Sequence, residues 1–219
     1  MQDNSRSVST NQPGIHPKLA QVVTKHLATR HREPTRAHNT AAYATLQETL
    51  AERGQRLVLD SFCGTGHSTA DLALRHPECL VAGIDQSASR LARHPAPQCD
   101  NYLLLQANCE AIWKQLADDG VVLRAHYLLY PNPWPKAAQL KRRVHGHPGF
   151  ADLVRLGGQV ELRSNWQLYV HEFEQAMQLA RARGSVVPLA ATEPELTLFE
   201  RKYRRSGHSL WAYRGEWMP

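Results

Sequence analysis

The stretch that decides the fold is Leu57-Val-Leu-Asp-Ser-Phe-Cys-Gly-Thr-Gly66. Its first four residues are typical of a short buried strand, and its two glycines allow a tight turn after that strand. A helix is predicted to begin at about Ser68. A buried strand, a glycine turn and a helix are the first part of a unit in which parallel strands alternate with helices.

The same alternation continues along the rest of the chain. We predict further strands over residues 80–85, 102–106, 126–130, 159–163, 185–189 and 209–213. We predict helices over residues 68–75, 88–93, 110–117, 150–155 and 167–181. This spacing predicts an α/β fold with a doubly wound, mostly parallel seven-stranded sheet and helices on both faces.

The chain divides into three parts by composition. Residues 1–14 are polar and are predicted to form a disordered tail. Residues 15–54 have helical character and are predicted to form an N-terminal helical arm that stops at Gly54. Residues 55–219 carry the alternating strands and helices and are predicted to form the main domain.

Composition excludes several classes of protein. No apolar run approaches the ~20 residues that span a bilayer, and the polar start has no apolar core of a secretory signal. The four cysteines include no C-x-x-C pair, so we expect reduced thiols in a cytoplasmic protein and no metal site. Lysine and arginine number 26 against 20 acidic residues, a net charge of +6, which favours an anionic partner.

The glycine turn is a candidate nucleotide site. Gly64 and Gly66 follow the first strand, and Asp85 ends the second, at the edge where open α/β sheets bind ligands. The Asp85 carboxylate can accept both hydroxyls of an adenosine ribose. Thr69 stands where a dinucleotide fingerprint has its third glycine, and the acid Asp60 suits a sulfonium or ammonium group better than a pyrophosphate. These residues favour S-adenosylmethionine over NAD.

Motifs after the fourth strand resemble those of a known family. Tyr130-Pro-Asn-Pro-Trp-Pro-Lys136 and Lys141-Arg142-Arg143 resemble the D-P-W-x-K and K-R-R motifs of the bacterial tRNA (guanine-N7-)-methyltransferases. Three later stretches match the family in order: Gly157-Gly158 with Ser164-Asn165-Trp166 and Tyr169, then Thr197-Leu-Phe-Glu200, then Gly207-His208 with Trp211. The resemblance extends from about Leu57 to Trp211. It implies a Rossmann-like class I methyltransferase that uses S-adenosylmethionine and methylates guanine 46 in the tRNA variable loop.

The resemblance also implies roles for individual residues. Cofactor binding is implied for Asp60, Gly64, Gly66, Asp85, Asn108 and Asn132. Catalytic roles are implied for Asn132, Lys136 and Asn165. Contacts with tRNA are implied for Lys136, Lys141, Arg142, Arg143, Asn165, Thr197, Phe199 and Glu200. The oligomeric state stays open between monomer and homodimer.

Three positions differ from the family pattern. Asn108, Asn132 and Asn165 stand where the family usually has aspartate. Methylation at N7 gives a guanine cation, and an amide at Asn132 or Asn165 supplies no full negative charge to stabilise it. We therefore expect slow methylation. Two alternatives remain open: a divergent enzyme that methylates another RNA or a small molecule, and an RNA-binding protein without activity.

Overall fold

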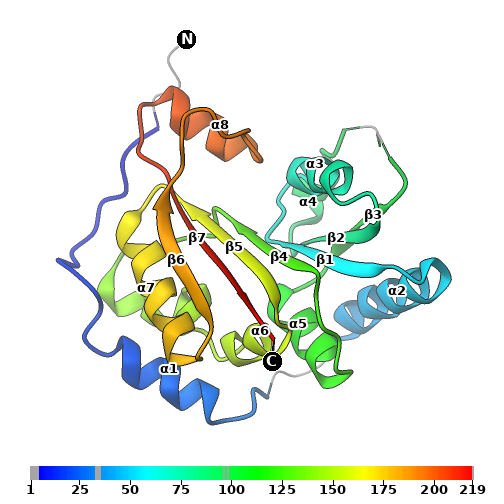
Figure 1. Cartoon of the computed structure of the whole chain (residues 1–219), viewed down its shortest axis with the longest axis horizontal. Helices are drawn as coiled ribbons and strands as arrows, with labels where there is room; N and C mark the ends of the chain where they lie inside the picture. The colour runs from blue at the N-terminus through cyan, green and yellow to red at the C-terminus, as the bar shows by residue number, and fades with distance from the viewer. Residues whose placement is uncertain (1–4, 33–35, 96, 98, 219) are drawn as a thin grey trace.

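The computed structural model describes residues 5–32, 36–95, 97 and 99–218. Its centre is one seven-stranded sheet with the strand order β3-β2-β1-β4-β5-β7-β6 (Figure 1). The strands are β1 (Arg56–Ser61), β2 (Cys79–Asp85), β3 (Tyr102–Gln106), β4 (Ala125–Leu129), β5 (Gly158–Ser164), β6 (Arg183–Pro188) and β7 (Trp211–Trp217). Strands β1 to β5 run parallel, and β7 is antiparallel to its neighbours β5 and β6. The predicted mostly parallel seven-stranded sheet is confirmed.

Helices connect the strands and cover both faces of the sheet (Figure 1). They are α1 (Leu19–Leu27), α2 (Ala37–Arg53), α3 (His67–Arg75), α4 (Ala88–Leu91), α5 (Cys109–Asp118), α6 (Phe150–Arg155), α7 (Gln167–Leu179) and α8 (Leu198–Arg205). Two short 3-10 helices, η1 (Ala137–Arg142) and η2 (Val144–Gly146), follow β4. Helix α8 and the two 3-10 helices were absent from the sequence prediction. No helix among the described residues is both long and apolar enough to cross a lipid bilayer.

The alternation of side chains along β1 builds a core on each face of the sheet. Leu57 and Leu59 belong to the larger core, to which α2, α5 and α7 also contribute. Val58 points to the opposite face and packs with Leu72 and Ala73 of α3. Successive residues of a strand face opposite sides, so a strand covered on both sides is apolar throughout. This double burial explains the unbroken apolar start of the stretch at residue 57.

The N-terminal arm is part of the same packed body. Leu19 and Val23 of α1 and Tyr43 and Leu46 of α2 are all buried in the larger core. Residues 1–4 of the predicted tail lie outside the described residues. The following segment passes along α7, from the end of α8 to α1 (Figure 1).

This segment differs from the predicted disordered tail because it has buried and specific partners. Gln12 is only 6% exposed, and its amide nitrogen donates to a carboxylate oxygen of Glu172. The Thr10 hydroxyl donates to the Pro135 carbonyl at 2.6 Å. The backbone amide of Ser5 donates to the hydroxyl of Ser206 at 3.1 Å. The polar side chains of this segment form hydrogen bonds with polar groups of the folded chain. Composition alone does not distinguish such a segment from a disordered one.

Candidate active site

A cleft of about 930 Å³ lies at the carboxyl ends of β1 to β4. This volume is in the range of small-molecule and cofactor sites. The candidate residues that line it are Gly64, Asp85, Asn108, Asn132, Lys141, Arg142, Thr197 and Phe199. The candidates that are not among its lining residues are Asp60, Gly66, Lys136, Arg143, Asn165 and Glu200. The structure therefore brings together residues from four strand ends and α8 around one cavity.

The carboxylate of Asp85 is held at the edge of the cleft. One of its oxygens accepts from the backbone amide of Ser87 at 2.8 Å. The other accepts from the backbone amide of Gly64 at 3.1 Å and from the Arg90 guanidinium at 3.4 Å. Gly64 has a φ of 62°, which favours glycine and lets its amide face Asp85. An acceptor fixed at the end of the second strand is suited to the ribose hydroxyls of an adenosine cofactor.

Asp60 lies behind the glycine turn rather than in the cleft. Its side chain is fully buried, and one carboxylate oxygen accepts from the hydroxyls of Ser68 and Thr69, at 2.6 and 2.7 Å. Burial raises the pKa of Asp60 to about 6, although the two hydroxyl hydrogen bonds oppose the shift. Its second oxygen, Oδ1, accepts no hydrogen bond from the described residues. Asp60 thus joins β1 to the first turn of α3. Thr69, at the position where a dinucleotide-binding site has glycine, donates one of the hydrogen bonds that make this connection.

Gly66 has a packing role. A Cβ at this position would lie 2.7 Å from a methyl of Leu104 and 2.8 Å from the His94 ring. Its φ of 76° is also unfavourable for other residues. The turn therefore needs Gly66 for its shape, while Gly64 supplies the contact with the cleft.

Asn108 connects the cleft to the N-terminal arm. Its side-chain oxygen caps α5 by accepting from the backbone amide of Ala111 at 2.8 Å. Its own backbone amide donates to the side-chain oxygen of Asn39 in α2 at 3.0 Å. Asn39 is only 1% exposed and was missed by the sequence analysis. A polar residue in the first turn of a weakly apolar helix gives no sign in the sequence of this contact.

The loop after β4 has a constrained backbone. Tyr130 and Trp134 have φ values of 57° and 46°, although neither is glycine. Such conformations cost ~1–3 kcal/mol each and persist only where the surroundings enforce them. The Asn132 side-chain oxygen accepts from the Trp134 amide at 3.3 Å, and the Arg142 guanidinium lies 4.8 Å from the centre of the Trp134 ring. Asn132 is thereby presented to the cleft on a bent, braced loop.

The prediction that Arg143 contacts tRNA is wrong. Arg143 is fully buried, so RNA phosphates cannot reach its side chain. Its guanidinium donates to Glu172, to the Trp134 carbonyl at 3.2 Å and to the Lys136 carbonyl at 3.4 Å. Burial favours the neutral form of Glu172, but His145 and Arg143 outweigh it and hold its pKa at about 2. Arg143 therefore binds the loop that carries Asn132. Lys136 itself is exposed outside the cleft lining.

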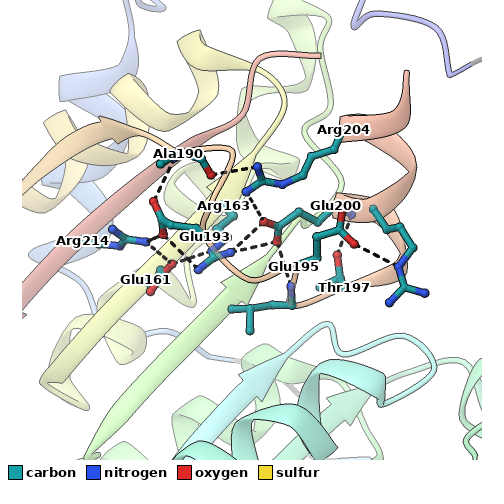
Figure 2. Close-up of polar contacts among 11 residues, drawn as sticks. Glu161, Arg163, Ala190, Glu193, Glu195, Thr197, Glu200, Arg204 and Arg214 are labelled. Atoms are coloured by element: carbon teal, nitrogen blue, oxygen red, sulfur yellow. Dashed lines mark hydrogen bonds and ion pairs between the residues drawn. The ribbon is translucent and has the colours of Figure 1, made fainter. Parts of the chain in front are cut away.

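The prediction that Glu200 contacts tRNA is also wrong. It is fully buried, and both of its carboxylate oxygens accept from one Arg163 nitrogen at 2.9 and 3.0 Å (Figure 2). Arg204 donates to it at 3.3 Å, and the Thr197 hydroxyl caps α8 by accepting from the Glu200 amide at 2.9 Å. Glu200 thus anchors the first turn of α8 to β5 and does not face a substrate.

Asn165 is not among the residues that line the cleft. Its amide nitrogen is 3.1 Å from Nδ1 of His208, and the other ring nitrogen of His208 is 2.9 Å from the Ser5 carbonyl. A carbonyl only accepts, so Nε2 carries the proton and Nδ1 accepts from Asn165. The residue predicted to be catalytic therefore fixes the orientation of the His208 ring.

The strand order, the antiparallel β7 and the cleft at the carboxyl ends define a class I S-adenosylmethionine-dependent methyltransferase. Residues 54–213 match the family model described as "Putative methyltransferase". The solved structure of the 16S rRNA methyltransferase KamB has a TM-score of 0.58 at 20% identity, over 80% of this chain and 94% of that one. The structure of an antibiotic-related methyltransferase has a TM-score of 0.59 at 14% identity, over 85% of this chain and 97% of that one. These two likenesses concern the fold.

Relatives in sequence give the family. A tRNA (guanine-N(7)-)-methyltransferase of Pseudomonas entomophila is 31% identical over 70% of this chain and 68% of its own length. The enzyme of that name from Ectopseudomonas mendocina is 31% identical over 68% of this chain and 67% of its own length. The chain belongs to the tRNA (guanine-N7-)-methyltransferase family.

Proposed function

We propose that this chain methylates N7 of guanine 46 in the variable loop of cytoplasmic tRNA. The observation that carries the proposal is the placing of the Asn132 loop and α8 as two walls of the cofactor cleft. The names of the relatives, tRNA (guanine-N(7)-)-methyltransferases, support the choice of tRNA and of N7.

The cofactor end of the cleft fits an adenosine group. S-adenosylmethionine supplies an electrophilic methyl group when it is bound. Asp85 would accept hydrogen bonds from the ribose hydroxyls. The side-chain nitrogen of Asn108, whose oxygen already caps α5, would donate to the adenine edge. The backbone at Gly64 comes close because no side chain intervenes. The buried, unpartnered Oδ1 of Asp60 behind this turn adds negative charge on the side where a cationic sulfonium would lie.

The reaction requires positioning more than proton transfer. Guanine N7 has a lone pair and no proton, so no general base is needed, and alignment of the two reacting atoms is the main demand. Asn132 lies on the loop that borders the cleft and would orient the base through its amide. The product guanine carries a positive charge that this amide stabilises less than a carboxylate would. Slow turnover is therefore part of the proposal.

The RNA contacts come from exposed cations on both walls. Lys141 and Arg142 line one wall, Lys202 lines the other, and Lys136 is exposed beside them. Each cation that neutralises a phosphate releases condensed counterions, so binding of tRNA should weaken steeply with salt. Of the predicted tRNA contacts, Lys141, Arg142, Thr197 and Phe199 line the cleft.

The test is an incubation of the protein with S-adenosylmethionine and two tRNA transcripts, one with guanine and one with adenine at position 46. Mass spectrometry of digested nucleosides should find N7-methylguanosine only with the first transcript. A different methylated nucleoside would establish the divergent-enzyme alternative. Salt-dependent tRNA binding without any methylation would establish the non-catalytic alternative.

A further inference from the structure

Helix α8 lines the cleft with two aromatic residues, Phe199 and Tyr203, of which Phe199 is the more exposed. Phe199 is 56% exposed and lines the cavity, whereas its neighbour Glu200 points inward to Arg163. Single exposed apolar residues are common on protein surfaces and mean little alone. Phe199 differs because it lies at the ligand cavity and because the helix that carries it is anchored by a buried ion pair (Figure 2).

The ring of Phe199 is the outer member of an aromatic stack. It lies 6.3 Å from the ring of Tyr203, at an angle of 25°. The ring of Tyr203 lies 5.3 Å from that of His208, at an angle of 15°. The far end of the stack is fixed by the hydrogen bond between His208 and Asn165. Phe199 is 56% exposed and lines the cavity, so part of its ring is accessible to a ligand in the cleft.

The surroundings indicate what ligand this is. Lys202, in the same helix, and Lys141 and Arg142, across the cleft, line the cavity with positive charge. On the opposite wall, one face of Trp134 is already covered by the Arg142 guanidinium. Flat rings beside cations are the combination with which proteins bind unpaired bases and their phosphates.

We propose that Phe199 is the platform on which the purine base of the substrate stacks, with Tyr203, His208 and Asn165 keeping its ring in place. This rests on the proposed function only for the identity of the RNA. A base must leave its helical stack before its reactive atom reaches a buried cofactor, and a protein ring replaces part of the lost stacking. The anchored first turn of α8 fixes the ring before the base arrives, which lowers the entropic cost of the contact.

The first test uses guanosine 5′-monophosphate as a probe, with the protein saturated with S-adenosylhomocysteine so that the adenosine end of the cleft is filled. Phe199→Ala should weaken binding of the nucleotide by about 5- to 100-fold, and Phe199→Trp should retain it. Leu74→Ala is the matched control, because Leu74 is 55% exposed but lies outside the cleft lining. Ribose 5-phosphate should bind equally weakly to all four proteins. Equal nucleotide affinity of wild type and Phe199→Ala, or no binding by wild type, would overturn the platform.

The second test is single-turnover formation of N7-methylguanosine in tRNA. Phe199→Ala should lower this rate by about 5- to 100-fold and leave the salt dependence of tRNA binding unchanged. If the nucleotide binds through Phe199 but tRNA gains no methyl group, the platform stands and the proposed tRNA function fails. If wild type and Phe199→Ala methylate tRNA equally fast, the tRNA function stands and the platform fails.

Discussion

Arg143 and Glu172 form an ion pair in which neither side chain is accessible to solvent. His145, Gln12 and the backbone amide of His16 also bond the carboxylate, at 3.2, 2.5 and 2.8 Å. A buried pair of this kind gives little net stability against an apolar pair of the same size, but removing one partner leaves an unpaired buried charge. The pair also holds the loop after β4 that borders the cleft, because Arg143 donates a hydrogen bond to the Trp134 carbonyl.

The variant Arg143→Met should therefore be strongly destabilised. We expect the free energy of unfolding to fall by ~3–5 kcal/mol, because Glu172 loses its buried partner. The matched control is Arg142→Met, which removes an exposed arginine and its contact with the Trp134 ring and should lower stability by no more than ~1 kcal/mol. Urea denaturation of both variants measures the difference. Equal midpoints for the two variants would contradict the assignment of Arg143 to the core.

Substitutions of two glutamates near α8, one buried and one at the surface, should also differ in their effect on stability. Glu200→Ala should cost ~1.5–3 kcal/mol, because the buried Arg163 loses two charged hydrogen bonds and keeps only its contact with Glu161 at 2.6 Å and a longer one with Glu193. Glu195→Ala removes an ion pair with Arg201, whose side chain is 51% exposed, and should cost no more than ~1 kcal/mol. Thermal or urea unfolding of the two variants is the measurement. A Glu200→Ala protein as stable as Glu195→Ala would show that the pair does not anchor α8.

Asp85→Ala should weaken the cofactor site. Loss of a charged hydrogen-bond partner should reduce the affinity for S-adenosylhomocysteine by ~1.5–3 kcal/mol in titration calorimetry. Asp71→Ala, at an exposed position of α3, removes the same charge and should leave the affinity unchanged. Unchanged binding by Asp85→Ala would remove this residue from the cofactor site.

Restoring the family residue at the cleft should speed methylation. Asn132→Asp places a carboxylate where the guanine cation forms, and a lowering of the barrier by ~1–2 kcal/mol would raise turnover about 5- to 30-fold. Ala138→Asp adds the same charge at an exposed site outside the cleft lining and should have no such effect. Single-turnover rates on tRNA measure both variants. A slower Asn132→Asp protein would indicate that the asparagine serves a different substrate.

The raised pKa of Asp60 predicts a pH dependence of stability. The folded state binds this proton more tightly than the unfolded chain, in which aspartate has a pKa near 4. The stabilisation is complete below about pH 4 and is lost as pH rises through about 6, the folded value. Relative to Asp60→Asn, the wild type should lose on the order of 2–3 kcal/mol between pH 4 and pH 7 in urea denaturation. Parallel pH profiles of the two proteins would show that Asp60 does not titrate in this range.

The sequence was a good guide to the central strands, because β1 to β4 each contain a short apolar run. It was a poor guide to α8, because the sequence L-F-E-R-K-Y-R-R is short and mostly charged. That helix forms because Thr197 caps it and Glu200 reaches Arg163 on β5. A contact between residues 37 positions apart leaves no periodic signal in the sequence.

The sequence correctly predicted the cleft residues whose place is determined by the ends of the strands. Asp85 ends a strand, Gly64, Asn108 and Asn132 closely follow strand ends, and all four residues line the cleft. Cations were harder to assign, because adjacent arginines look alike in a sequence. Arg142 is exposed and Arg143 is buried because only the second faces Glu172, 29 residues further along the chain.

The segment from Ser5 to Gln12 has a practical consequence for anyone who prepares this protein. Its polar composition invites trimming before crystallisation, and an affinity tag would often be placed there. Removing it would delete Gln12, which bonds both members of the buried Arg143–Glu172 pair, and Thr10, which holds the loop at Pro135. A protein without this segment would therefore have a less ordered loop at one wall of the cleft. A low activity measured with it would reflect the truncation and not the native enzyme.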